Sequence, residues 1–164
     1  MASSNVLRQI APEERFADEA VTTIARRQEP AELRFSKFWD HYDAGPDRRW
    51  QIEVLKPLTE YVNMAEGWDS YSGVPLRWDA GFFALWVLNE VMRPRTPIPQ
   101  VVPSPVGGVQ FEWHEKDIDL ELHVTGPYQC ELWFEDHRTG ERLSEELSND
   151  LSPLVRPISK LTAR

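Results

Sequence analysis

Apolar and polar residues alternate between residues 109 and 134, in three consecutive segments. A period of two is typical of strands that bury one face of a sheet. The pattern predicts an antiparallel meander, followed after a turn at 138–141 by a weaker fourth strand near 141–147. The inward-facing residues are Val109, Phe111, Trp113, Ile118, Leu120, Leu122, Val124, Tyr128, Cys130, Leu132 and Phe134.

The turns between these segments predict how the strands pair. A two-residue turn at 116–117 keeps apolar residues opposite one another, and a four-residue turn that preserves this parity remains an alternative. A three-residue turn there would place core residues opposite polar ones. With a second turn at 125–127, the expected pairs are Trp113 with Leu120, Phe111 with Leu122, Leu122 with Cys130, and Leu120 with Leu132.

This pairing arranges the polar residues in rows across the other face of the sheet. The expected rows are Glu112, Glu121 and Glu131; His114, Asp119 and Trp133; and Gln110, His123 and Gln129. Opposed carboxylates lie about 5 Å apart and repel one another. Three interpretations remain open: a solvated face, a surface that meets a cationic partner protein, and a metal or catalytic carboxylate site. Trp133 is either covered by the chain's own helices or an exposed anchor.

Helical spacing of apolar residues precedes the predicted sheet. The expected helices are 12–28, a segment that starts at Pro30, 47–65 and 76–92. The last is the most apolar and should be central, and Gly81 within it indicates a close helix contact. Pro57 should kink or divide the third helix.

The fold class that follows is α+β, with N-terminal helices packed on one face of a C-terminal antiparallel meander sheet of three to four strands. A loose tail is expected at 1–11 and a single domain at 12–164. Within that domain we expect a helical part at 12–92, a Pro-rich connector at 93–107, the sheet at 108–147 and an irregular C-terminus at 148–164. Pro153 and Pro157 argue against a long closing helix.

The stretch GWDSYSG, residues 67–73, joins two predicted helices. Gly67 is placed to end the first helix, and Asp69 should accept hydrogen bonds from backbone N–H groups in an Asx-type turn. We expect Trp68 and Tyr71 to pack against the core. The stretch is therefore interpreted as a structural corner rather than a ligand-binding loop.

Charge and composition disfavour some classes of function and some cellular locations. The chain has 164 residues and a formal net charge of −9, which disfavours direct binding to nucleic acid. The first residues lack a signal-peptide pattern, and the longest apolar run is too short to span a membrane. With a single cysteine, these features predict a cytoplasmic protein.

Motifs that would indicate catalysis or a cofactor are missing from the sequence. It contains no HExxH, no paired Cys and His pattern for zinc, no GxSxG, no P-loop and no GxGxxG. Cys130 belongs to the inward-facing set and is interpreted as a core residue. We therefore predict no catalytic residue, no metal ligand and no cofactor.

Two stretches, GWDSYSGVPL and PQVVPSPVGGVQFEWHEKDIDLELHV, resemble an uncharacterised family of bacterial proteins. The shared pattern is GWD-x-Y, a Pro, an Ala-rich helix, P-x-V-x-P and GG-[VI]-Q-x-EW, and it covers residues 67–124. The resemblance implies a bacterial or phage origin. It brings no assigned activity and no catalytic residue.

These features favour a non-enzymatic protein-interaction module, of the antitoxin, immunity or inhibitor-like type, that neutralises a basic partner protein. The candidate partner-binding residues are Glu112, His114, Asp119, Glu121, His123, Glu131 and Trp133. One alternative is a small metal-dependent hydrolase that uses the sheet carboxylates with His123. A second alternative is an acidic mimic of nucleic acid.

Overall fold

The computed structural model of the chain describes residues 30–40 and 49–163. The predicted tail at 1–11 and helix at 12–28 lie outside these residues. The elements in chain order are α2 (Ala31–Ser36), the 3-10 helix η1 (Lys37–Asp40), α3 (Arg49–Val62), α4 (Trp78–Val91), β1 (Gln100–Ser104), β2 (Gly108–Glu115), β3 (Ile118–Gly126), β4 (Gln129–Asp136), β5 (Glu141–Leu147) and α5 (Ser152–Ala163).

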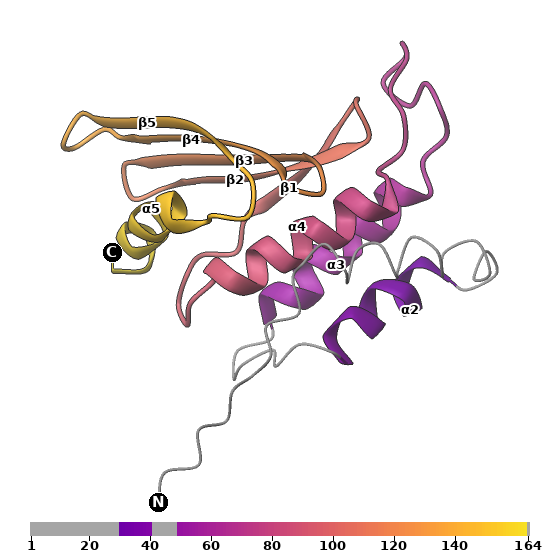
Figure 1. The fold of residues 1–164 in the computed structure, drawn as a ribbon, viewed down its shortest axis with the longest axis horizontal. Coiled ribbons are helices and arrows are strands. Elements are labelled where there is room, and N and C mark those ends of the chain that lie inside the picture. The colour runs from indigo at the N-terminus through magenta and orange to yellow at the C-terminus, as the bar shows by residue number, and fades with distance from the viewer. Residues whose placement is uncertain (1–29, 41–48, 164) are drawn as a thin grey trace, which may run out of the picture.

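The five strands form one antiparallel sheet in the order β1-β2-β3-β4-β5. The described helices lie on one side of it, with α2 farthest from the strands (Figure 1). The α+β class is confirmed, and so is the fourth strand at 141–147. The count of three to four strands is wrong because β1 forms inside the predicted Pro-rich connector. Pro103 is tolerated there because β1 is an edge strand, where a missing N–H need not break a ladder.

The first hairpin has the predicted register. Trp113 pairs with Leu120 and Phe111 pairs with Leu122. Lys116 and the following Asp117 have φ values of 58° and 61°, as a two-residue type I′ turn requires. The two-residue turn is therefore the correct alternative of the two that parity allowed.

The second hairpin differs from its predicted register by two residues. Leu122 pairs with Leu132 instead of Cys130, which pairs with Val124. The turn lies at 127–128, later than expected, and the ladder is irregular between Val124 and Gly126, where one extra residue forms a bulge. A shift of two residues keeps every core side chain on the inner face, but it changes which polar residues are neighbours on the other face.

Two helices differ from expectation at their prolines. The irregular C-terminus predicted at 148–164 is wrong, because α5 spans Ser152–Ala163. Its apolar stripe of Leu154, Ile158 and Leu161 is buried in the core, and such burial outweighs a weak local propensity. Helix α3 runs undivided through Pro57, so of the two effects expected of this proline, a kink or a division, the division is wrong.

A buried ion pair holds α5 against the sheet. Asp136 at the end of β4 is fully buried, and Lys160 Nζ lies 2.7 Å from its Oδ2 and 2.6 Å from Glu141 Oε2. The backbone N–H groups of Arg138 and Thr139 donate to Asp136 Oδ1. Each oxygen of this carboxylate is therefore met by a donor, and the hydrogen bond with Asp136 raises the pKa of Lys160.

Helix α4 lies at the centre of the core, as its apolar circumference predicts. Nine of its residues are buried, including Gly81, where a Cβ would lie 3.0 Å from Phe35 Cζ. The predicted close helix contact at this glycine is confirmed. The guanidinium of Arg34 lies 3.6 Å from the centre of the Trp78 ring, so α2 is joined to α4 by a cation–π contact as well as by apolar packing.

The Asx-type turn predicted at Asp69 is confirmed. Its Oδ1 accepts hydrogen bonds from the backbone N–H groups of Tyr71 at 2.9 Å and Gly73 at 2.8 Å. These bonds hold the pKa of the Asp69 carboxyl below its usual value. Gly67 has a φ of 75°, but α3 ends five residues earlier at Val62, so Gly67 closes the loop instead of capping the helix.

The aromatic residues of this corner do not fill the core as predicted. Tyr71 is 87% exposed, and Trp68 is only half-buried, with its Nε1 donating to Val74 O at 3.0 Å. The loop is closed by its own hydrogen bonds, including one from Gly67 N to Gly73 O at 2.7 Å. Because the backbone bonds define the corner, neither aromatic ring needs to be buried to hold it.

We predict that Lys160→Met lowers the free energy of unfolding by about 3 kcal/mol, because it leaves the buried Asp136 without its cation. Urea denaturation measures this loss. Arg156→Met is the matched control, since Arg156 forms an exposed pair with Glu141 and should contribute at most about 1 kcal/mol. Equal losses in the two variants would contradict the role assigned to the buried pair.

Candidate functional site on the outer face of the sheet

We call the side of the sheet that faces away from the described helices the outer face (Figure 1). The strand pairing places polar and aromatic side chains of all five strands there. They include Gln110, Glu112 and His114 of β2, Asp119, Glu121 and His123 of β3, Glu131, Trp133 and Glu135 of β4, and Arg142, Ser144 and Glu146 of β5.

The rows across this face are confirmed for two strands and corrected for the third. They are His114, Asp119, Glu135 and Arg142; Glu112, Glu121, Trp133 and Ser144; and Gln110, His123, Glu131 and Glu146. Glu131 therefore does not join the Glu112 row as predicted, and Trp133 takes its place. The two-residue shift of β4 is the cause.

The opposed carboxylates of Glu112 and Glu121 share a hydrogen-bond donor. Gln110 Nε2 lies 2.8 Å from Glu112 Oε1 and 3.2 Å from Glu121 Oε2. One amide group can donate both of its protons in this way. The sequence alone indicated a repulsive pair here, whereas the structure supplies a neutral bridge between the two charges.

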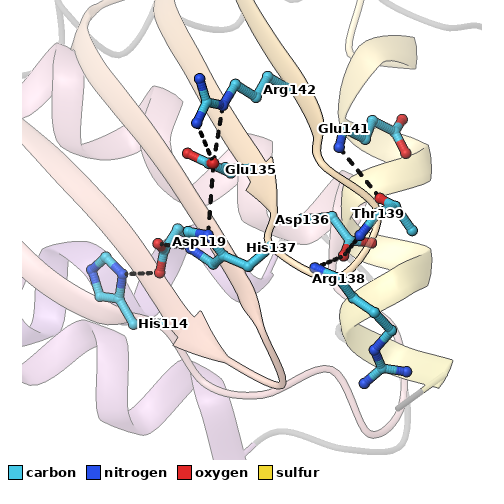
Figure 2. Close-up of polar contacts among 9 residues, drawn as sticks. All are labelled: His114, Asp119, Glu135, Asp136, His137, Arg138, Thr139, Glu141 and Arg142. Carbon is cyan, nitrogen blue, oxygen red and sulfur yellow. Dashed lines mark hydrogen bonds and ion pairs between the residues drawn. The ribbon is translucent and has the colours of Figure 1, made fainter.

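A second group, which we call the Asp119 cluster, consists of His114, Asp119 and His137 (Figure 2). His114 Nδ1 lies 2.8 Å from Asp119 Oδ1, and His137 Nε2 lies 2.6 Å from Oδ2. The two imidazoles lower the pKa of Asp119, His137 most. The hydrogen bond with Asp119 raises the pKa of each imidazole in turn.

Sequence reasoning missed three members of this region, namely Glu135, His137 and Arg142. Arg142 donates to Glu135 Oε1 from Nε at 2.9 Å and from Nη2 at 2.7 Å, and His137 Nδ1 lies 3.6 Å from the same oxygen. The signal that could have found Glu135 is the correct β4 register, which sets it opposite Asp119. His137 follows the end of β4, where the alternation typical of a strand no longer predicts to which face a side chain points.

His123, in the third row, makes its contacts outside these two groups. His123 Nε2 lies 2.8 Å from Ser104 Oγ of β1, and its Nδ1 lies 3.9 Å from Glu131. His114 and His123 lie on opposite sides of the row of Glu112 and Glu121, as the predicted pairing of β2 with β3 requires. The metal-dependent hydrolase considered from the sequence would combine His123 with Glu112 and Glu121. In the described chain, His123 instead contacts Ser104 and Glu131.

Trp133 lies within a row of acidic and polar residues and is 37% exposed. Its register partners are Glu121 and Ser144, and Glu131 and Glu135 flank it on its own strand. None of the four α-helices labelled in Figure 1 covers this side of the sheet. Helices α2 to α5 therefore do not cover Trp133, and the predicted helix at 12–28 lies outside the described residues.

Within residues 30–40 and 49–163, no group of three or more His, Cys, Asp or Glu side chains is arranged to hold a metal ion. No helix in the same residues is both long enough and apolar enough to cross a bilayer. Comparisons with models of known protein families, with curated proteins and with solved structures found no match. The resemblance noted in the sequence stays a prediction, and function has to be argued from the outer face.

We predict that His114 and His137 titrate above the usual histidine pKa of about 6.5, and that Asp119→Asn lowers both values. NMR titration of the imidazole resonances measures this. Glu146→Gln removes the same charge from another row and is the control. Two histidines that titrate normally in the wild type would contradict the cluster.

The same contacts predict how stability depends on pH. Raised imidazole pKa values stabilise the fold fully below about pH 6.5, and this contribution is lost as the pH rises through the folded values. The lowered pKa of Asp119 contributes above about pH 4 and is lost in acid. The stability difference between wild type and Asp119→Asn should therefore be larger at pH 5 than at pH 9 in denaturation experiments; a constant difference would contradict the contacts.

We expect Gln110→Leu to lower the free energy of unfolding by about 1 kcal/mol at neutral pH, because it removes the donor between Glu112 and Glu121. Gln110→Glu should cost more, since it adds a third carboxylate. High salt should reduce both losses, and the loss in Gln110→Glu more. Urea denaturation at low and high salt compares them, and losses that are equal and independent of salt would argue against an electrostatic role for Gln110.

Proposed function

We propose that the outer face is a protein-docking surface, and that the chain is a non-enzymatic interaction module that binds a basic partner protein in the cytoplasm. Its mode of action would be that of an antitoxin, immunity or inhibitor-like protein. The observation that carries the proposal is Trp133, an exposed indole set among carboxylates on a sheet face that no described helix covers.

Charge supports a cationic partner. The outer-face side chains of the four strands β2 to β5 include six carboxylates and one arginine, which leaves five excess negative charges when the histidines are neutral. Such a field steers a positive surface toward the sheet and makes the encounter depend on ionic strength. It also disfavours anionic ligands, in line with the net charge of −9 of the whole chain.

Trp133 supplies a large apolar contact area, which charged side chains alone do not provide. Tryptophan and arginine dominate the binding energy of many interfaces, because a large rigid side chain buries much area at low entropic cost. A partner arginine or lysine that stacks on the indole can gain a cation–π contact. Glu121 opposite the ring and Glu131 beside it on β4 can accept hydrogen bonds from this cationic group.

The surface itself suits a macromolecule better than a small substrate. Its side chains project from adjacent strands of a hydrogen-bonded sheet, so the face is organised before a partner arrives, which reduces the ordering cost of binding. Cys130 is free and buried on the inner side, where desolvation raises the pKa of its thiol to about 12. A thiol of that kind is a poor nucleophile, which favours a binding role over covalent catalysis.

A charge-matched pair of variants tests the proposal. The face variant combines Glu121→Lys with Trp133→Ala. The control combines Glu90→Lys with Ile52→Ala, which makes the same charge change and the same kind of apolar truncation at exposed positions of α4 and α3. Wild type and both variants serve as baits in bacterial extract. A candidate partner is a protein retained by wild type and control but lost by the face variant.

The candidate partner is then purified and measured by titration calorimetry. We expect the face variant to bind at least about tenfold more weakly than wild type, the loss typical of a central anchor, and the control to bind within about threefold of wild type. Affinity should also fall as salt is added. The proposal fails if no protein follows this pattern, or if the partner's contact surface is not basic.

A further inference from the structure

Both carboxylate oxygens of Asp119 are already engaged. His114 Nδ1 from β2 lies on one oxygen, and His137 Nε2 from the end of β4 lies on the other (Figure 2). The His114 and His137 side chains are 47% and 49% exposed, and the Asp119 side chain is 28% exposed. The carboxylate is thus within reach of a docking protein, and each of its oxygens carries an imidazole contact with which such a protein would compete.

The charged groups around these imidazoles come from every neighbouring element. Glu112 of β2 lies 3.4 Å from His114 Nε2, and Glu135 of β4 lies 3.6 Å from His137 Nδ1. The nearby cations are engaged elsewhere: Arg142 of β5 pairs with Glu135, and Arg138 in the turn after β4 pairs with Asp117 at 3.1 Å. The charged groups next to the two imidazoles are therefore carboxylates.

Protonation changes what this cluster presents to a partner. With both imidazoles protonated, the two histidines and Asp119 carry one net positive charge, and with both neutral they carry one net negative charge. A swing of two charges at one end of the outer face alters its attraction for a basic surface. The hydrogen bonds to Asp119 raise both imidazole pKa values, which brings the swing toward the neutral range.

We propose that the Asp119 cluster makes binding at the outer face depend on pH: the two imidazolium groups occupy Asp119 in acid, and a cationic side chain of the partner replaces them as the pH rises. This inference rests on the proposed docking function. The replacement is an exchange of cations on one carboxylate, and the protons released from His114 and His137 pass to solvent.

Thermodynamic linkage makes the inference measurable in two independent ways. If deprotonation of the imidazoles favours binding, affinity for a cationic ligand must rise with pH. By reciprocity, a bound cationic ligand must lower the pKa of His114 and of His137. The second effect can be measured on the unmodified protein, so it does not depend on any variant folding correctly.

The experiment uses octa-arginine with an acetylated N-terminus and an amidated C-terminus as a defined basic probe, because the charge of this blocked peptide stays constant between pH 5.5 and 8.5. Binding to the full chain is measured at both pH values and fixed ionic strength. For wild type we expect about tenfold tighter binding at pH 8.5. The double variant His114→Gln and His137→Gln should show less than about threefold, whereas His123→Gln, the matched control in another row, should keep the full effect.

The wild-type measurement is an NMR titration of the imidazoles with and without saturating octa-arginine. We expect the pKa of His114 and His137 to fall in the presence of the peptide. Binding that is independent of pH in wild type, a pH effect that persists in the double variant, or unchanged imidazole pKa values would each overturn the switch while leaving the docking function intact. If wild type does not bind octa-arginine at either pH, the docking function itself fails, and the switch fails with it.

Discussion

Burial of one face of the meander against the helices is the constraint on which the remaining features depend. Phe111, Leu120 and Phe134 occupy three adjacent strands and are almost completely buried in the core, and α4 and α5 lie on the same side of the sheet (Figure 1). Since successive side chains of a strand point to opposite faces, this packing commits the residues between them to the outer face. Charges and histidines gather there because the core excludes them.

The outer face compensates part of its own charge. Gln110 bridges Glu112 and Glu121, Arg142 neutralises Glu135, and two imidazoles enclose Asp119. These contacts reduce the repulsion between carboxylates in the rows of Glu112 and Asp119, whereas Glu131 and Glu146 stay directly opposed in the third row. They do not account for Trp133, which gains nothing from exposure in the free protein. An exposed indole beside partly compensated carboxylates is better suited to a docking surface than to a merely solvated one.

The elements that could be predicted are those in which local chemistry and burial agree. The first hairpin follows from parity, because only an even turn keeps Trp113 opposite Leu120. The second hairpin does not, because a bulge between Val124 and Gly126 adds a residue without a pattern in the sequence. Strand β1 and helix α5 were missed for a related reason: their prolines indicate irregular backbone, and only an edge position or a buried apolar stripe makes regular structure favourable there.

The features of the candidate site also fall into those that the sequence predicts and those that only the structure reveals. By itself the sequence determined the fold class, the polar composition of the outer face and the pairing of Glu112 with Glu121, since period two and the first turn depend on neighbours along the chain. Only the tertiary structure decided that Trp133 takes the place of Glu131, that Gln110 bridges two carboxylates, and that His137 completes the Asp119 cluster. The places of Trp133 and His137 depend on the register of β4, which long-range packing and one bulged residue set. The Gln110 bridge depends on how side chains of β2 and β3 pack on the outer face.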